Sequence, residues 1–529
     1  MAAGAMTGAE SVLRTLSAGG VKTCFANPGT SEMHLVAALD RVPEVRPVLA
    51  LFEGVASGAA DGYGRMAEVP AATLLHLGPG LGNAFANLHN AYKARTPMVN
   101  VVGDHAVAHA PLNAPLASDI ASVARPVSHW YASARDARSA ATDAAAALAA
   151  ARGHGGGIAT LVVPADAGWE ASAGPAAPLP VPPPAPVPQD AVEAAARALR
   201  GGGAAALLIG GSATRGRALR AAARIAAATG AQLIHDTFPA RLERGAGIPR
   251  AQPLPYLTEM ATEALAGLDH LVICGTQAPV AFFAYPGRPS RLAAPGTAIE
   301  VLAGPREDVA GALEALADAL GAPAGAAPGA DAARPELPDG ALDAAVIGAA
   351  IAALLPEGAI VVDESVTASA PIVAATAGAA PHDWLTLTGG AIGQGLPAAT
   401  GAAVACPDRP VLSLEGDGSA MYTIQALWTQ AREGLDVTTV ILANRSYAIL
   451  DFELSRVGAG SGDAPDGGAL ARGPAAEALF GIGRPDLDFV GLAAGMGVPG
   501  VRVDHAQGFA AALREALAEP GPRLIEARV

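Results

Sequence analysis

Short apolar runs alternate with helical patterns along most of the 529-residue chain. The runs "RPVLALF" and "AATLLHL" flank the helical stretch "GVASGAADGYGRM", and the same layout returns near the C-terminal end in "RPVLSLEGDG" and "VTTVILAN". Buried runs of about four to eight residues separated by helices are typical of parallel sheets with crossover helices. The chain is therefore predicted to be α/β, with doubly wound parallel sheets.

Two stretches lack both patterns and divide the chain. Residues 172–189, "SAGPAAPLPVPPPAPVPQ", hold too much proline for a helix or an interior strand, and residues 321–340 are rich in Pro, Gly and Ala. The segments that remain, 1–171, 190–320 and 341–529, each have the size of a domain. Three α/β domains joined by two linkers are expected.

The composition excludes several classes of protein. A net charge of −15 without clustered Lys and Arg argues against binding to nucleic acid or to an anionic membrane. The three cysteines show no metal-ligand spacing, and no strongly apolar run is long enough to span a membrane. The N-terminal stretch lacks the regions of a signal peptide. We expect a soluble, cytoplasmic protein.

Polar side chains follow two expected strands in "SLEGDGSA" and "VILANRSY". Asp417 ends the first run and Asn444 the second. In a doubly wound sheet such positions meet at the carboxyl edge, where ligands bind. Gly416 and Gly418 allow close approach of the backbone, and a helix expected to begin near Ser419 directs N–H groups at an anion. This donor set suits Mg²⁺ bound to a diphosphate.

Gly-Asp-Gly alone is more often a simple turn than a ligand site. The whole pattern, an acid between glycines and then a helix and a strand ending in Asn, resembles the cofactor signature of thiamine diphosphate enzymes. That family usually has a paired Asn-Asn where this chain has Ala443 and Asn444. The resemblance implies thiamine diphosphate and Mg²⁺ as cofactors, with Asp417, Asn444 and the carbonyl of Ser446 as metal ligands.

Glu53 follows an expected strand and opens the stretch "EGVASGAADGYGRM". Carboxylates are favoured in first helical turns, so the position alone has a structural explanation. The stretch nevertheless resembles the glutamate region of the pyrimidine-binding domain of these enzymes. The resemblance implies that Glu53 activates the cofactor by exchanging a proton with its pyrimidine ring.

The stretch "LTLTGGAIGQGLPAATGAA" resembles the segment that bends the cofactor in this family. The resemblance implies that Ile392 wedges beneath the bent molecule and that the carbonyl of Gly390 receives the pyrimidine amino group. The alternative is a glycine-rich loop that only packs against a sheet. Thr367, in "DESVTAS", is a further candidate for binding the diphosphate.

The resemblance covers nearly the whole chain, in the order pyrimidine-binding domain, Rossmann-like middle domain and diphosphate-binding domain. It implies a homodimer or homotetramer, because in these enzymes two subunits share each site. The stretches "ANPGTSEMHLVAALD" and "LLHLGPGLGN" are similar to benzoylformate decarboxylases and acetolactate synthase-like proteins. By this similarity Thr30 replaces an active-site serine, and His76 matches a catalytic histidine.

The middle segment departs from the decarboxylases. Its loop "GTQAPVAFFAYPGRPS" lacks their second histidine, and Phe282, Phe283 or Tyr285 could fill that space. His105 is a candidate proton donor, with an equally good explanation as a surface histidine. The flavin-associated arginine-aspartate motif and a nicotinamide fingerprint are not found.

The expected activity is decarboxylation of a 2-oxo acid, after which the enamine is protonated to an aldehyde or joined to an aldehyde or ketone acceptor, as in acetolactate synthase-like enzymes. The alternatives are a simple benzoylformate-decarboxylase-like enzyme, a lyase of 2-hydroxyacyl compounds and a noncatalytic subunit. Residues 455–481, rich in Gly and Ala, are expected to form either a flap over the site or a loop.

Overall fold

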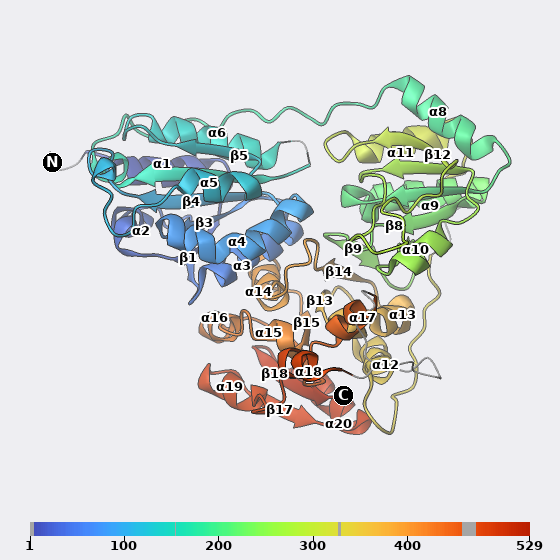
Figure 1. Cartoon of the computed structure of the whole chain (residues 1–529). Coiled ribbons are helices and arrows are strands. Elements are labelled where there is room, and N and C mark those ends of the chain that lie inside the picture. The colour runs from blue at the N-terminus through green and yellow to red at the C-terminus, as the bar shows by residue number, and fades with distance from the viewer. Residues whose placement is uncertain (1–4, 154, 326–328, 457–471) are drawn as a thin grey trace.

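The structure is a computed structural model that describes residues 5–153, 155–325, 329–456 and 472–529. Its helices and strands form three sheets, nearly all parallel, in three lobes (Figure 1). The first lobe is blue to cyan, the middle lobe green to yellow, and the third lobe runs from yellowish tan through orange to red. The predicted α/β fold with three parallel sheets is confirmed. Among the described residues, no helix has the length and apolar character needed to cross a membrane.

The first lobe contains a six-stranded sheet in the order β2-β1-β3-β4-β6-β5. Its strands are β1 (Thr23–Asn27), β2 (Arg46–Leu49), β3 (Ala71–Leu75), β4 (Met98–Asp104), β5 (Trp130–Ser133) and β6 (Ile158–Pro164). Its helices are α1 (Gly8–Ala18), α2 (Met33–Leu39), α3 (Glu53–Ala67), α4 (Leu77–Ala94), α5 (Ile120–Ala124), α6 (Ala140–Arg152) and α7 (Ala165–Trp169).

The middle lobe contains a five-stranded sheet in the order β10-β8-β7-β11-β12. Its strands are β7 (Ala205–Ile209), β8 (Gln232–His235), β10 (Gln252–Pro253), β11 (His270–Cys274) and β12 (Ala298–Ala303). Its helices are α8 (Gln189–Arg200), α9 (Gly216–Thr229), α10 (Thr258–Ala264) and α11 (Val309–Ala319).

The third lobe contains a seven-stranded sheet in the order β17-β18-β16-β15-β13-β14-β9. Its strands are β9 (Leu242–Arg244), β13 (Ile360–Glu364), β14 (His382–Thr386), β15 (Val411–Gly416), β16 (Val437–Ala443), β17 (Gly500–Val503) and β18 (Arg523–Arg528). Its helices are α12 (Ala344–Leu354), α13 (Ser369–Ala375), α14 (Gly395–Ala405), α15 (Asp417–Ala420), α16 (Ala426–Glu433), α17 (Ala448–Arg456), α18 (Pro474–Phe480), α19 (Phe489–Gly495) and α20 (Ala506–Ala518).

Helices cover both faces of these sheets, which explains the continuous apolar runs of the sequence. Every residue of β3, β6 and β16 is buried. Because successive side chains of a strand point to opposite faces, Leu75 joins the core that contains Phe25, whereas Leu74 joins the core on the other face with Ala26. Strands buried on both sides have no polar face and so show no alternation.

Strand β9 belongs to the middle stretch of the chain but pairs antiparallel with β14 of the third sheet. Arg241, directly before β9, forms an ion pair of 2.7 Å with Asp383 on β14, and Arg409 pairs with the same carboxylate at 2.7 Å. The division of the chain into domains, with a central domain at residues 190–320, stays a prediction. Strand β9 lies inside this predicted central domain and connects it to the sheet of the third lobe.

Helices α3 and α14 join the first and third lobes at very close range. A Cβ atom added to Gly62 would lie 1.9 Å from the carbonyl oxygen of Ala398, and one added to Gly401 would lie 1.7 Å from that of Ala59. Real Cβ contacts are never so short, so only glycine permits this separation of the two helices.

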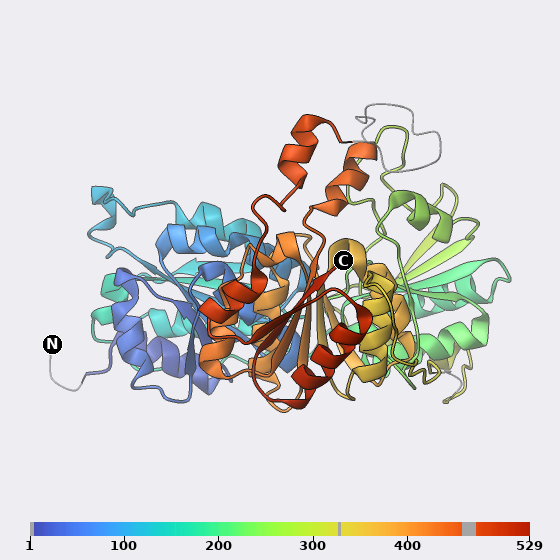
Figure 2. The same ribbon diagram turned by 90° about the horizontal axis from the view of Figure 1, so that it is seen from below.

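Helices α17 and α18 stand out from the third lobe toward the side of the middle lobe, at the top of Figure 2. The expected flap over residues 455–481 lies partly outside the described residues, since 457–471 are not among them. Its described part contains α18 and Arg472, whose guanidinium forms an ion pair of 2.5 Å with Asp451 on α17.

His382 lies buried at the start of β14, and this burial predicts a loss of stability in acid. Burial, and next the nearby Arg244 guanidinium, lower its pKa to about 4. An unfolded histidine titrates near pH 6.5, so between these values the unfolded state binds the proton and the folded state does not. Its contribution to the free energy of unfolding is complete above about pH 6.5, and roughly 2–3 kcal/mol should be lost as the pH falls toward 4.

Urea unfolding at pH 7 and pH 4.5 measures this loss. His382→Gln cannot take up the proton, so its midpoint should shift less between the two pH values than that of the unchanged protein. His505→Gln, at an exposed position, is the control. Equal shifts for all three proteins would contradict the prediction.

Candidate active site

The carboxyl edge of the third sheet brings Asp417 next to the segment that follows β16. Strands β15 and β16 run parallel with Gly416 opposite Leu442, so the residues after them meet. The Oδ2 atom of Asp417 accepts the backbone N–H of Arg445 at 2.5 Å, and Oδ1 accepts that of Gly418 at 2.8 Å. The adjacency expected from the strand order is therefore present.

Asp417 is a buried carboxylate at this edge. It is 3% exposed, and burial raises its pKa while the backbone N–H groups act in the opposite direction. The Arg445 side chain turns instead to Asp486, at 3.0 Å. In the described part of the chain, no Lys, Arg or His side chain forms an ion pair with Asp417. A buried charge costs free energy unless it is paired, so this position fits a bound cation.

Asn444 and Ser446 lie at the exposed rim of the same edge. The Oδ1 atom of Asn444 accepts the backbone N–H of Ser446 at 2.9 Å, and the Ser446 hydroxyl accepts a hydrogen bond of 2.6 Å from Arg472. Arg445 between them has a left-handed backbone, with φ of 60°. One carboxylate, one amide oxygen and the backbone carbonyl of Ser446 are oxygen donors of the kind that Mg²⁺ takes.

The turn after β15 differs in part from the expected helix. Helix α15 begins at Asp417 rather than near Ser419 and lasts four residues, and a turn separates it from α16. A Cβ atom on Gly418 would lie 2.3 Å from the Tyr447 ring, which requires glycine there. The Ser419 hydroxyl donates to the carbonyl of Gly416 at 3.0 Å. Thr367 is exposed in a short 3-10 turn after β13.

Helix α4 of the first lobe holds the loop that precedes α14. Asn90 donates to the carbonyl of Ala391 at 2.7 Å, and Asn87 donates to that of Gly393 at 3.0 Å. In this loop Gly390 is exposed with φ of 74°, and Ile392 is half-buried. These two residues, expected to hold the bent cofactor, therefore lie on a segment fixed from both lobes.

A pair of buried acids also supports the loop that precedes α14. Glu364 ends β13 opposite Glu415 on β15, and its carboxylate accepts the N–H groups of Gly393 at 2.6 Å and Gly395 at 2.5 Å. Burial raises the pKa of Glu364 to about 7, and burial and then Glu364 raise that of Glu415 well above the usual range. Backbone N–H groups favour the charged form of Glu364. We therefore assign the negative charge of the pair to Glu364 and a proton to Glu415.

Replacing Glu364 by Ala should destabilise the protein by about 2–4 kcal/mol, because two buried N–H groups would lose their acceptor. Chemical denaturation of the cofactor-free protein measures this, with Glu44→Ala at an exposed position as control. An unchanged unfolding midpoint would show that the loop does not depend on this carboxylate.

In the first lobe, Glu53 is the first residue of α3 and is 7% exposed. Asn83 donates to its Oε2 atom at 3.0 Å, and a Cβ atom on Gly80 would lie 3.1 Å from Oε1. Glycine at position 80 thus leaves room for the carboxylate. No hydrogen bond within the described residues joins Glu53 to Asp417, and the sharing of a site between two subunits stays a prediction.

His76 follows β3 and is held by two residues that the sequence analysis missed. Its Nδ1 atom lies 2.9 Å from Oε2 of the fully buried Glu32 and 3.1 Å from the Ser31 hydroxyl, which also donates to Glu32. Thr30 is exposed, so Ser31 rather than Thr30 contacts the imidazole. The sequence feature that could have revealed this contact is Glu32, the acid that ends "GTSE" two positions after Thr30.

His105 lies at the same edge of the first sheet as His76, since it follows β4, which neighbours β3. Its backbone N–H donates to Asp104 at 2.7 Å, and its ring is 5.3 Å from that of His109. Its Nε2 atom is buried without a hydrogen-bond partner in the described part of the chain. This ring nitrogen is therefore shielded from solvent.

Aromatic residues of the middle-lobe loop gather against α17. Phe282 contacts Tyr256, with ring centroids 4.9 Å apart, and the Tyr285 hydroxyl donates to Glu453 on α17 at 2.5 Å. Arg456 lies over the Tyr285 ring at 4.6 Å. Phe283 is 58% exposed. Of the three expected substitutes for the absent histidine, Phe282 and Tyr285 are thus engaged in packing.

Two family models match the chain. The one described as "Thiamine pyrophosphate enzyme, N-terminal TPP binding domain" matches residues 6–123, and the "C-terminal TPP binding domain" matches residues 369–527. The chain is 57% identical over 521 residues to the "Putative acetolactate synthase large subunit IlvX" of Mycobacterium tuberculosis, covering 98% of each. It is 29% identical to the benzoylformate decarboxylase of Pseudomonas aeruginosa, covering 96% of each.

A solved structure is also similar. The thiamine diphosphate-dependent 4-hydroxybenzoylformate decarboxylase of Rhodococcus jostii RHA1 matches with a TM-score of 0.84 and 26% identity, over 99% of each chain.

Proposed function

Because the chain belongs to the thiamine pyrophosphate enzymes, we propose that it uses thiamine diphosphate and Mg²⁺ to decarboxylate a 2-oxo acid. The product is then either released as an aldehyde or joined to an aldehyde or ketone acceptor. The observation that carries the proposal is Asp417, a buried carboxylate beside Asn444 at the carboxyl edge of a parallel sheet, with no cationic partner among the described residues.

The residues present fit both groups. Asp417, the Asn444 amide oxygen and the Ser446 carbonyl would bind Mg²⁺, and the turn from Gly416 to Ser419, with Thr367, would receive the diphosphate. Gly390 and Ile392 would hold the pyrimidine ring. When bound, thiamine diphosphate supplies a carbanion that adds to the substrate carbonyl and accepts the electron pair left by carbon dioxide.

Glu53 would hold and return the proton at the pyrimidine nitrogen. Its near-complete burial keeps water away, and Asn83 fixes one carboxylate oxygen. Proton transfer by a positioned side chain contributes about 10²–10⁴ in rate.

Glu32 would orient His76 for proton transfer to the substrate. A buried acid at 2.9 Å from Nδ1 favours the tautomer with the proton on Nδ1, so Nε2 accepts a proton and then delivers it. The Ser31 hydroxyl would add a hydrogen bond to the His76 imidazole. Thr30 and His105 are further candidates for contacting the substrate at this edge of the first sheet.

The substrate class rests on relatives. Two similar proteins are named for benzoylformate or 4-hydroxybenzoylformate decarboxylation, and the relative with 57% identity carries the name "Putative acetolactate synthase large subunit IlvX". All three names imply a 2-oxo acid, and the last favours joining to a carbonyl acceptor. We further propose a cytoplasmic homodimer or homotetramer.

A substrate panel tests the function. Carbon dioxide and carbon products are followed with aliphatic and aromatic 2-oxo acids, each with and without an aldehyde acceptor. Release that needs thiamine diphosphate and Mg²⁺ supports the proposal, and hydroxyketone or aldehyde then distinguishes carboligase from decarboxylase. Tight cofactor binding without release from any acid would favour a lyase of 2-hydroxyacyl compounds or a noncatalytic subunit.

A further inference from the structure

A buried ion pair in the middle of α3 is joined to residues 386–394, which precede α14 and which we call the pre-α14 segment. Arg65 donates two hydrogen bonds to the Asp61 carboxylate, at 2.9 Å from Nε and 2.6 Å from Nη2. The two side chains are 2% and 0% exposed. Burying two charges costs free energy that is recovered only where their remaining hydrogen-bonding groups also find partners. The positions of those partners therefore show what the pair holds.

These partners lie at both ends of the pre-α14 segment. The Nη1 atom of Arg65 donates to the carbonyl of Thr386 at 2.8 Å, and Nη2 donates to the Thr388 hydroxyl at 2.9 Å. At the other end, the amide of the buried Gln394 donates to Oδ2 of Asp61 at 2.7 Å. A buried polar network whose members are satisfied is rigid. The ion pair thus fixes the first and the last residues of the segment to one helix.

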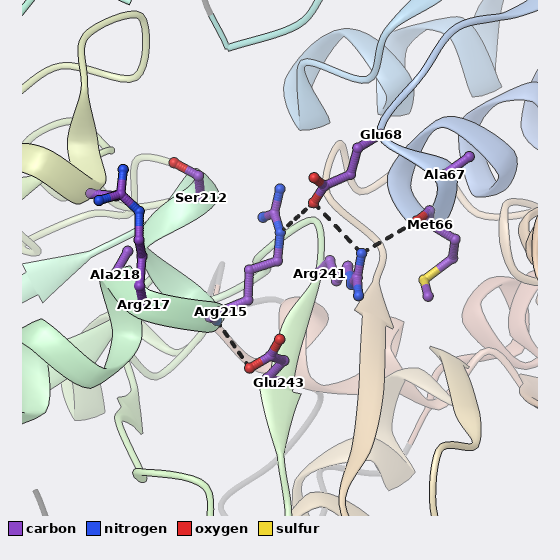
Figure 3. A pocket seen from close by; sticks show the side chains of 11 residues that line it. Met66, Ala67, Glu68, Ser212, Arg215, Arg217, Ala218, Arg241 and Glu243 are labelled. Carbon is purple, nitrogen blue, oxygen red and sulfur yellow. Dashed lines mark hydrogen bonds and ion pairs between the residues drawn. The ribbon is translucent and has the colours of Figure 1, made fainter.

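The end of α3 is also fixed to the strand that leads into the segment. Figure 3 shows this end beside a cavity of about 450 Å³. Arg241 donates to the carbonyl of Met66 at 3.4 Å and forms an ion pair of 3.6 Å with Glu68. The same guanidinium pairs with Asp383 on β14 at 2.7 Å. Because this connection does not involve the segment, α3 should stay beside β14 when a contact between the ion pair and the segment is removed.

Between its fixed ends the segment contains Gly390 and Ile392, the two residues expected to hold the pyrimidine ring. The turn at Gly390 has a left-handed backbone, with φ of 74°. Its own hydrogen bond is long, since the N–H of Gly390 lies 3.4 Å from the carbonyl of Leu387. The conformation of the turn therefore depends on the contacts that fix the segment on either side of it.

We propose that Asp61 and Arg65 are positioning residues for the pyrimidine half of the cofactor site. By fixing both ends of the pre-α14 segment, the pair sets the positions of Gly390 and Ile392. This inference rests on the proposed function. The carboxyl edge that contains Asp417 is formed by β15 and β16 and does not depend on the pair. Loss of the pair's contacts should therefore weaken binding of the pyrimidine half and leave binding of the diphosphate half unchanged.

Calorimetric titration of the full chain with thiamine diphosphate, and separately with inorganic diphosphate, tests this division, with Mg²⁺ present in both. Gln394→Met keeps the length of the side chain and removes the amide that reaches Asp61. This variant should bind thiamine diphosphate about tenfold more weakly, the value of one charge-assisted hydrogen bond, and inorganic diphosphate with unchanged affinity.

Thr96→Val is the matched control. The Thr96 hydroxyl donates to Oδ1 of the same Asp61 carboxylate at 2.5 Å and has no hydrogen bond to the pre-α14 segment among the described residues. Its removal should leave both affinities unchanged. Arg65→Lys is a second variant: it keeps the charge but lacks the planar fork that reaches Asp61 and the segment together. It should show the same difference between the two ligands as Gln394→Met.

Hydrogen exchange of the cofactor-free protein provides a readout that does not involve binding. Backbone amides of residues 386–395 should exchange faster in Gln394→Met than in Thr96→Val, with no change across β16. Unchanged thiamine diphosphate affinity in both variants, equal losses of affinity for the two ligands, or unchanged exchange in the segment would overturn the inference. Failure of the unchanged protein to bind thiamine diphosphate would overturn the proposed function itself, and the inference with it.

Discussion

Glu53→Gln is expected to lower thiamine-diphosphate-dependent carbon dioxide release by at least a hundredfold. The amide keeps an acceptor oxygen for Asn83, which donates to the carboxylate at 3.0 Å, but it cannot exchange a proton with the pyrimidine nitrogen. Loss of a positioned acid or base costs about 10²–10⁴ in rate. Steady-state rates with the best substrate of the panel give the measurement.

Cofactor affinity separates this role from a structural one. Because the size and packing of the side chain are kept, the variant should bind thiamine diphosphate within a few-fold of the unchanged protein. Glu44→Gln, an exposed glutamate of the same lobe, serves as control and should keep full activity. A rate in Glu53→Gln within tenfold of the unchanged protein would remove Glu53 from the proton transfer.

Asp417→Asn is expected to weaken Mg²⁺-dependent binding of thiamine diphosphate by about a hundredfold or more. The loss of even an indirect contact to a metal costs about 10–100-fold in affinity, and Asp417 is the only charged residue among the expected ligands. Calorimetric titration with the cofactor at several Mg²⁺ concentrations measures the change.

The stability of the metal-free variant should change much less than its cofactor affinity. Burial raises the pKa of Asp417, so a neutral amide relieves the cost of the buried charge, while one of the two backbone N–H groups at Arg445 and Gly418 loses its acceptor oxygen. Because these two effects oppose each other, the metal-free variant should melt at about the same temperature as the unchanged protein. Asp486→Asn, which weakens the exposed ion pairs of Arg445 and Arg528 and leaves the proposed metal ligands in place, is the control. An unchanged Mg²⁺ dependence in Asp417→Asn would rule out a metal site there.

The parts of the fold that depend on local pattern could be predicted from the sequence. Continuous apolar runs identified the parallel sheets, because strands covered on both faces have no polar side. The order of two successive strands placed Asp417 beside Asn444, because a crossover connection leaves their carboxyl ends at one edge.

Features that depend on contacts between distant segments were missed. Strand β9 has three residues, too few for a periodic signal, and its partner β14 lies far along the chain. Glu364 and Glu415 read separately as acids at strand ends, and only the register makes them a pair. Ser31 and Glu32 lie 45 and 44 positions before His76 in the sequence, and they reach it because β1 and β3 are neighbouring strands.

The glycine contacts between α3 and α14 limit how the protein can move. With backbone atoms in close contact at Gly62 and Gly401, the two helices cannot slide past each other or come closer without a clash. Glu53 at the start of α3 and the loop before α14 therefore belong to one packed unit within the chain, and α17 and α18, which stand outside this contact, are left as elements that can move without disturbing it.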